Sequence, residues 1–383
     1  MQNYDVIILG GGIVGAACAN ECARAGLSVA VVEPRVVGGG ATAAGMGHIV
    51  TMDDSTAQFA LTRYSQQLWN ALAPQLPDDC EFRMTGTLWV AADDEEMAEV
   101  RRKAEFYEMR GVAVEILDEQ QLAAAEPNLR RGLAGALRVA QDSVIYPPCA
   151  AKFLLQQSGA TMFAGRAATE ITANGVILDN GTQLSSGAIV NATGHWSPEL
   201  TPGIAVKKRK GHLIITDRYP DFVRHQLIEL GYLKNAHASD ADSVAFNAQP
   251  RATGQILLGS SRQFGAETSE TEPKMVNAML RRAAEYMPQL AQLSALRIWT
   301  GFRAATPDHL PLIGEAGSRQ PATGSKLFLA TGHEGLGITT SLGTAQIIAD
   351  LLTGRETAID ATPYAPTRQL KAEARALARV LLT

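Results

Sequence analysis

Three glycines near the start of the chain have the spacing of a loop that binds the phosphates of a dinucleotide. Gly10, Gly12 and Gly15 follow the apolar run Val6–Leu9, which is typical of a buried parallel strand, and an alanine-rich stretch that favours a helix comes next. Gly10 allows a tight turn, Gly12 lets the backbone approach a pyrophosphate, and Gly15 lets helix and strand pack closely. The free N–H groups at the helix N-terminus would then hold the phosphate charge.

Glu33 ends the next predicted strand, residues 28–32, and completes this βαβ pattern. Its carboxylate can accept hydrogen bonds from ribose hydroxyls, and its charge would repel the 2′-phosphate of NADP. The residue does not distinguish NAD from FAD, and a purely structural glycine turn is the alternative interpretation. We predict a dinucleotide site whose first segment contains Gly10, Gly12, Ile13, Val14, Gly15, Glu33 and Pro34.

The composition is that of a folded protein with no general affinity for nucleic acids. The chain has 383 residues, of which 46% are hydrophobic and 19% charged, and its formal net charge is −5. The basic run Lys207–Lys210 is therefore expected to be a solvated strand end. No apolar stretch reaches the roughly 18 residues of a spanning helix, and the polar start leaves no room for a signal peptide. We predict a cytoplasmic protein, with peripheral membrane association left open.

The cysteines give no sign of a metal site or a disulfide. Cys18, Cys22, Cys80 and Cys149 lack the paired spacing of metal ligands. Cys18 and Cys22 are four residues apart in the predicted first helix, so we expect them to be small buried hydrophobic residues. This cysteine usage is typical of a reducing compartment, and no metal is predicted.

The order of predicted elements indicates two domains of different kinds. Apolar strands that end in glycine occur at the start of the chain and at residues 188–193 and 327–331, whereas strands dominate from residue 207 to residue 258. The sequence therefore predicts an α/β fold (α+β overall), in which a Rossmann-like domain built from discontinuous segments carries an inserted β-sheet-rich domain. The nucleotide domain is assigned residues 1–80, 142–206 and 302–383, and the inserted domain residues 81–141 and 207–301.

These features resemble the FAD-dependent D-amino-acid oxidase superfamily, in particular its glycine oxidase, sarcosine oxidase and amino-acid dehydrogenase branch. The resemblance extends over essentially the whole chain, and its two C-terminal blocks are the more specific part. It implies that the Rossmann-like domain binds FAD in an extended form, with the flavin ring facing the inserted domain, which holds the substrate. The matching blocks are Gly10–Glu33, Ile189–Gly194, Gly301–Asp308 with Pro311–Gly314, and Ala330–Gly337.

Three further segments, Gly45–Val50, Phe246–Arg251 and Gly254–Gly259, are similar to a narrower group of dehydrogenase subunits. That group includes D-hydroxyproline dehydrogenase, opine oxidases and the flavin subunit of hydrogen cyanide synthase. The similarity implies a hetero-oligomer in which other subunits carry an iron–sulfur centre or a second flavin. This chain has no four-cysteine cluster of its own, so such a centre would have to come from another chain.

The resemblance also implies which residues contact the cofactor. The loop 38–48 would lie beside the flavin ring, and residues 335–340 would open a helix whose N-terminus stabilises negative charge on the ring, with a plain glycine turn as the alternative. No cysteine lies in the C-terminal blocks, so FAD is expected to bind noncovalently. The further cofactor residues expected are Thr42, Ala43, Gly45, Met46, Gly47, Ala192, Thr193, Gly194, Gly335, Leu336, Gly337, Ile338 and Thr339.

The resemblance also implies that Arg303 and His48 are catalytic and substrate-binding residues. A guanidinium at position 303 can give a substrate carboxylate two parallel hydrogen bonds, and the alternative is a buried ion pair with Asp308. His48 could orient the substrate, influence the ring or carry a proton near neutral pH, and the alternative is a structural histidine. Asn247 and Gln249 stand where glycine oxidases carry an assisting tyrosine, and we expect them to line the substrate pocket.

The expected reaction is hydride transfer from the carbon next to nitrogen of an amino or imino acid to flavin N5, which gives an imine. D-Hydroxyproline or a similar cyclic or secondary amino acid is the candidate substrate. The alternatives are an oxygen-using oxidase of the glycine or sarcosine type, an opine-oxidising flavin subunit of a hetero-oligomer, and an FAD-binding protein without catalysis. The sequence does not separate an oxidase from a dehydrogenase.

Overall fold

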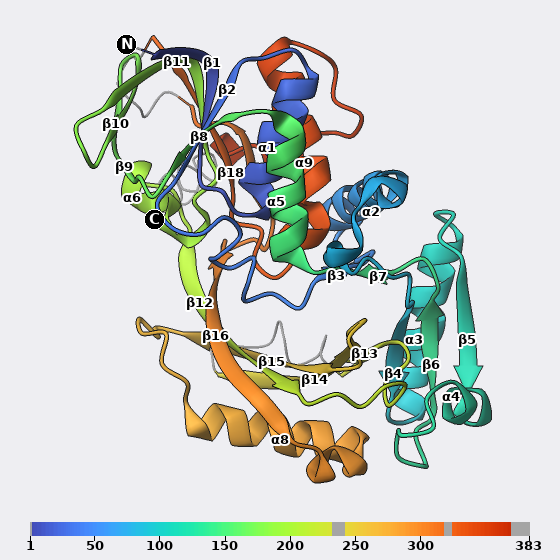
Figure 1. The fold of residues 1–383 in the computed structure, drawn as a ribbon. Coiled ribbons are helices and arrows are strands. Elements are labelled where there is room, and N and C mark those ends of the chain that lie inside the picture. The colour runs from blue at the N-terminus through green and yellow to red at the C-terminus, as the bar shows by residue number, and fades with distance from the viewer. Residues whose placement is uncertain (1, 232–241, 318–323, 369–383) are drawn as a thin grey trace, which may run out of the picture.

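Two large sheets, one in the upper and one in the lower part of Figure 1, form the body of the molecule. The computed structural model describes residues 2–231, 242–317 and 324–368. Each sheet has eight strands, and a short antiparallel pair forms a third, separate sheet. That pair consists of β3 (His48–Ile49) and β7 (Ser143–Val144).

The first sheet has the order β17-β18-β11-β1-β2-β8. Its central strands β18, β11, β1 and β2 are parallel. Residues Val6–Leu9 of β1 are buried, because helices and loops cover both faces of the sheet there. The bounds are β1 (Gln2–Leu9), β2 (Val29–Glu33), β8 (Thr161–Ala164), β11 (Gln183–Asn191), β17 (Leu312–Glu315) and β18 (Lys326–Thr331). An antiparallel extension adds β9 (Ala168–Thr172) and β10 (Gly175–Leu178).

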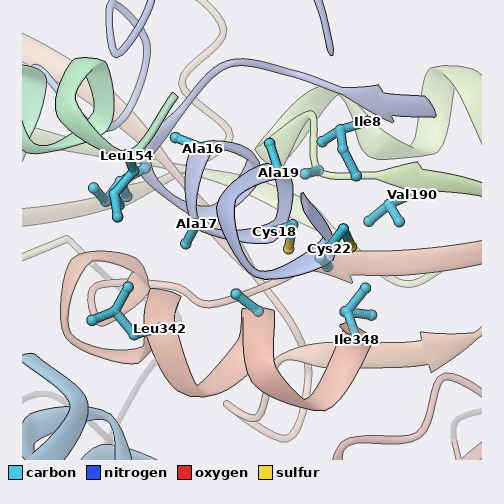
Figure 2. Close-up of a cluster of buried hydrophobic side chains, with 14 of the residues drawn as sticks. Ile8, Ala16, Ala17, Cys18, Ala19, Cys22, Leu154, Val190, Leu342 and Ile348 are labelled. Carbon is cyan, nitrogen blue, oxygen red and sulfur yellow. The ribbon is translucent and has the colours of Figure 1, made fainter. Parts of the chain in front are cut away.

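Three helices pack beside the first sheet, and small side chains of the central helix, α1, allow the other two to pack closely against it. These are α1 (Ile13–Arg24), α5 (Pro147–Ser158) and α9 (Gly337–Thr353). Figure 2 shows Ala16, Ala17 and Ala19 of α1 among larger side chains of its neighbours. Cys18 and Cys22 are buried in the same core, as the sequence predicted, and they are not joined by a disulfide.

The second sheet has the order β16-β12-β15-β14-β13-β4-β6-β5. The helix α8 (Pro273–Tyr286) packs along its outer face, where Tyr286 stacks on Phe246 with ring centroids 4.8 Å apart. The bounds are β4 (Thr87–Ala91), β5 (Val114–Asp118), β6 (Gly135–Val139), β12 (Lys207–Thr216), β13 (Gln226–Glu229), β14 (Ser243–Pro250), β15 (Ile256–Phe264) and β16 (Ala295–Ala305). The other α-helices of the described residues are α2 (Thr56–Leu72), α3 (Asp94–Glu108), α4 (Glu119–Ala125) and α6 (Ser197–Leu200).

The predicted fold class is confirmed, because a mostly parallel Rossmann-like sheet is combined with a second, β-rich unit. The second sheet takes its strands from residues 87–139 and 207–305, and β16 continues across the predicted domain boundary at residue 302. The domain boundaries themselves stay a prediction. Within the described segments, no helix has the length and apolarity to cross a bilayer, and no three His, Cys, Asp or Glu side chains group as a metal site.

A buried carboxylic acid lies beneath the segment that follows β3. Asp142 has no exposed surface, and its Oδ1 accepts hydrogen bonds from the backbone N–H of Thr51 at 3.3 Å and from Nε2 of Gln66 at 2.7 Å. Burial raises the pKa of Asp142 to about 7, because removing water penalises the charged form more than these hydrogen bonds favour it.

We expect Asp142→Asn to change how stability depends on pH. Between the ordinary pKa of 3.8 and the folded value of about 7, the folded protein holds a proton that the unfolded chain has lost. Over that window the wild type therefore loses at most about 1.4 kcal/mol of unfolding free energy per pH unit as the pH rises, and asparagine removes this loss. Urea unfolding at pH 4, 5, 6, 7 and 8 should show that the unfolding free energy of the variant rises relative to that of the wild type up to about pH 7. Above that pH the difference between the two should stay constant. A difference that stays constant with pH would contradict the assignment.

Candidate active site

A cavity of about 850 Å³ is lined by residues of both large sheets and of the loop between β2 and β3. Glu33 and Gly12 line its nucleotide-fold part, and Arg303, Asn247 and His48 line it from the second sheet and β3. The volume lies within the range of ordinary small-molecule and cofactor sites. The cavity is therefore the place where the predicted site residues can meet.

The three motif glycines are needed for different reasons. Gly10 has φ of +102°, and a Cβ at Gly15 would lie 1.9 Å from the carbonyl oxygen of Gly10, so the fold itself requires both glycines. A Cβ at Gly12 would meet only the hydroxyl of Thr42, at 3.2 Å, and Gly12 lines the cavity. Gly12 thus has a single close neighbour and faces the cavity, which suits a group that approaches the backbone from the cavity.

The nucleotide end of the cavity has groups that could bind an anion and hydroxyl groups. Gly12, the N-cap residue of α1, has no side chain to cap the helix, and the first turn holds no acidic residue, while the hydroxyl of Thr42 accepts a hydrogen bond from the backbone N–H of Ile13 at 3.0 Å. Glu33 accepts hydrogen bonds from the backbone N–H groups of Gly11 at 2.7 Å and of Arg35 at 2.9 Å. These bonds hold the carboxylate at the end of β2, where it lines the cavity.

A second helix N-terminus also borders the cavity. The helix α9 begins at Gly337 with no side-chain cap and no acidic residue in its first turn, and Gly337 and Ile338 line the cavity. Its free backbone N–H groups carry partial positive charge. An elongated cofactor with phosphates at one end and a ring that becomes negative at the other fits this pair of helix N-termini. The site therefore fits FAD.

His48 lies on β3, and its ring nitrogen Nε2 is buried with no hydrogen-bond partner among the described residues. Burial lowers the pKa of His48 to about 4. The ring is therefore neutral near pH 7 in this structure, and the role as a proton carrier at neutral pH stays a prediction that the lowered pKa does not favour. Orientation of a bound molecule remains compatible with its position at the cavity wall.

We expect the His48 ring to show no titration by NMR between pH 8 and pH 5.5, because its pKa is lowered to about 4. Comparing ring signals of the wild type and His48→Gln would assign the resonance. A midpoint near 6.5 would mean that the charged form is accommodated and would restore the role as a proton carrier.

Arg303 enters the cavity from β16 without an ionic partner among the described residues. Its Nη1 donates a hydrogen bond to the carbonyl oxygen of Ser261 at 3.0 Å, and burial lowers its pKa to about 10, so the guanidinium stays charged at neutral pH. The predicted alternative, an ion pair with Asp308, is wrong, because Asp308 pairs with Arg368 instead. A partly buried cation without a counter-charge is costly, so the site favours binding of an anion.

The two predicted amide side chains on β14 do not share one environment. Asn247 lines the cavity, and its Oδ1 is buried without a hydrogen-bond partner among the described residues. Gln249 is fully buried but does not line the cavity, although neither of its amide atoms has a partner within the described segments. Of the two amide side chains, Asn247 is therefore the one placed to contact a ligand in the cavity.

Most of the other predicted cofactor residues line the cavity, and the exceptions have structural reasons. The hydroxyl of Thr339 donates to the carbonyl oxygen of His48 at 2.8 Å, which ties α9 to β3. Gly15 serves the contact between α1 and the loop before it. The predicted residues that do not line the cavity are Gly15, Ala43, Gln249, Leu336 and Thr339.

Several lining residues had no signal in the sequence. They lie on strands β12 and β15 of the second sheet or in the turn after β11, where no motif marks which side chain faces inward. Examples are Gly211, Leu213, Ser260 and the pair His195 and Trp196.

The basic run at the start of β12 is not the solvated strand end that the sequence predicted. Arg209 and Lys210 are buried and form ion pairs with Glu334 and Glu272, respectively. Lys208 is partly exposed and pairs with Glu267. The acidic partners come from segments far along the chain, so the local sequence could not reveal them.

Comparison with known proteins agrees with this geometry. The family described as FAD dependent oxidoreductase (DAO) matches residues 5–351. A glycine oxidase of Geobacillus kaustophilus strain HTA426 is 28% identical over 387 residues, covering 96% of this chain and 98% of that protein. Hydrogen cyanide synthase subunit HcnC of Pseudomonas aeruginosa strain PAO1 is also 28% identical, with 96% of each chain covered. A crystal structure of glycine oxidase from Geobacillus kaustophilus superposes with a TM-score of 0.84 at 27% identity, covering 96% of this chain and 99% of that one.

Proposed function

Because the chain belongs to the family of FAD-dependent oxidoreductases, we propose that it oxidises an amino or imino acid at the carbon bonded to nitrogen. The observation that carries this proposal is the guanidinium of Arg303, which is charged, lines the cavity and has no carboxylate partner among the described residues. A substrate carboxylate would supply the missing negative charge through paired, charge-assisted hydrogen bonds.

FAD is the cofactor, and we propose that it is held noncovalently between the two helix N-termini. Gly12 and Glu33 would receive its pyrophosphate and ribose, and Gly337 would face the ring. Bound FAD supplies an acceptor for the hydride, while the N-terminus of α9 stabilises the negative charge that the ring acquires. Arg303 orients the substrate by its carboxylate, and the neutral His48 ring offers one more polar contact at the cavity wall.

The proposed substrate is D-hydroxyproline or a similar cyclic or secondary amino acid, which yields an imine. Glycine oxidases among the relatives support the alternative of an oxygen-using glycine- or sarcosine-type oxidase. A further alternative is an opine-oxidising flavin subunit in a hetero-oligomer with iron–sulfur or second-flavin partners, and the HcnC relative, named as a synthase subunit, supports its multi-subunit part. A cytoplasmic location belongs to the same proposal.

The experiment is a screen of flavin bleaching without oxygen. Purified protein saturated with FAD is mixed anaerobically with D- and L-amino acids, proline, hydroxyproline, sarcosine, glycine and opines, and the visible flavin absorption is followed. The proposal expects rapid bleaching by at least one α-amino or imino acid and none by the matching amine without a carboxylate. Mixing the reduced protein with oxygen then separates oxidase from dehydrogenase. If no compound bleaches the flavin, the alternative of an FAD-binding protein without catalysis is favoured.

A further inference from the structure

Two glycines enclose the guanidinium of Arg303. A Cβ at Gly211 of β12 would lie 2.4 Å from Nη1 of Arg303 and 2.9 Å from Cζ and Nη2. On another side, a Cβ at Gly335 would lie 3.8 Å from Nε. Neither glycine has a left-handed backbone, so local conformation does not explain their type. The space that glycine leaves at position 211 is filled by the end of the Arg303 side chain.

The strand partner of Gly211 is also a glycine and makes a different contact. Gly301 of β16 pairs directly with Gly211, and a Cβ at Gly301 would lie 2.2 Å from the Cβ of Ala44. Ala44 lines the cavity and belongs to residues 41–47, the part of the loop 38–48 called loop 41–47 below, which the family resemblance places beside the flavin ring. On β15, a Cβ at Gly259 would lie 2.8 Å from Sδ of Met46 in the same loop. The loop thus rests on the second sheet at points without side chains.

We propose that Gly211 and Gly301 form a two-residue notch in the second sheet that positions the carboxylate anchor and the cofactor loop separately. Gly211 is a positioning residue for the Arg303 guanidinium, and Gly301 is a positioning residue for the loop 41–47. The Gly211 part rests on the proposed function, because it assumes that Arg303 binds the substrate carboxylate. The Gly301 part concerns retention of FAD and does not depend on the substrate.

The atoms that a new methyl group would meet determine what each substitution does. In Gly211→Ala the methyl group meets the end of a flexible side chain, so Arg303 can move while the sheet stays intact. A displacement of about 1 Å at a positioning group can cost about 100-fold in rate or affinity. In Gly301→Ala the methyl group meets Ala44, whose Cα is only 3.7 Å away, so the loop backbone itself must move.

The first experiment measures substrate affinity in the FAD-saturated enzyme, as the dissociation constant from the concentration dependence of anaerobic bleaching by the amino acid found in the screen. Gly211→Ala is expected to raise this constant about 10- to 100-fold while FAD content stays that of the wild type. In an Arg303→Ala background, where no side chain remains for the new methyl group to displace, the same substitution should change it less than about twofold. An unchanged constant in Gly211→Ala, or an equal loss in both backgrounds, would overturn the Gly211 assignment.

The second experiment measures FAD release by the recovery of free-flavin fluorescence on dilution, without any substrate. Gly301→Ala is expected to raise the FAD dissociation constant roughly tenfold, whereas Gly211→Ala leaves it unchanged. Equal FAD retention in Gly301→Ala and wild type would overturn the Gly301 assignment. If Arg303→Ala leaves substrate affinity intact, the proposed function fails; if Arg303→Ala weakens binding but Gly211→Ala does not, only the notch fails.

Discussion

Replacing Arg303 with alanine is expected to lower kcat/KM for the amino-acid substrate by roughly 30-fold to a few thousand-fold. This range corresponds to the 2–5 kcal/mol that is typically lost when one partner of a buried, hydrogen-bonded charge pair is truncated. No carboxylate of the described residues pairs with this guanidinium, which lines the cavity from β16. In the alanine variant, a substrate carboxylate would therefore lose its charged hydrogen-bond donor on this strand. Steady-state kinetics with the substrate from the bleaching screen would measure the loss.

Two comparisons distinguish the loss of an anchor from general damage. Arg297 lies on the same strand, is exposed and stacks on Trp299, so Arg297→Ala should leave kcat/KM within about twofold of the wild type. The matched amine that lacks a carboxylate should be oxidised equally poorly by Arg303→Ala and by the wild type. A variant that still prefers the acid over the amine as strongly as the wild type would show that the carboxylate binds elsewhere.

Gly12→Val is expected to abolish stable FAD binding while the protein remains folded. The only atom of the described residues within 4 Å of a Cβ at Gly12 is the hydroxyl oxygen of Thr42, at 3.2 Å, so a side chain there needs a shift of a few tenths of an ångström in Thr42. The added atoms occupy the cavity in front of the α1 N-terminus. A pyrophosphate that must approach this backbone would be blocked. The measurement is the ratio of flavin to protein absorbance after gel filtration, together with the melting temperature of the FAD-free protein.

Two other glycines provide the contrast. Gly187 lies on β11 of the same sheet, exposed and away from the cavity, and a Cβ there would have only an ordinary contact at 3.4 Å, so Gly187→Ala should keep its FAD. Gly15→Ala should lower the melting temperature even without FAD, because its Cβ would fall 1.9 Å from the backbone oxygen of Gly10. If Gly12→Val retained a full complement of FAD, the phosphate site would have to lie elsewhere.

Features that depend on neighbouring positions in the chain could be predicted from the sequence. The strand, glycine turn, helix and acid between Val6 and Glu33 lie within one βαβ unit, and each residue type serves a local backbone need or a ligand contact. The helical residues 56–72 were likewise predictable from their periodicity and coincide with α2, whose N-cap Ser55 accepts a hydrogen bond from Gln58. Burial of Cys18 and Cys22 follows from the same local pattern.

Features that depend on burial or on distant partners could not be predicted in this way. The low pKa of His48 results from burial of its ring in the folded protein. Arg303 forms no ion pair with Asp308, because Asp308 pairs with Arg368, 60 positions further along the chain. Gln249 was expected beside Asn247 because the two residues are close in sequence, but the course of β14 takes one of them beyond the cavity.

The sequence by itself therefore determined the Rossmann-like unit and the dinucleotide-binding loop, because these depend on residue type and spacing within short stretches. Arg303 became a candidate anchor through the resemblance of its segment to a known family. Only the tertiary structure decided which strand residues face the cavity and which charges remain unpaired. Gly211 touches Arg303, 92 positions away, only because β12 and β16 pair in one particular register. That register is selected by packing over the whole sheet, which no local pattern contains.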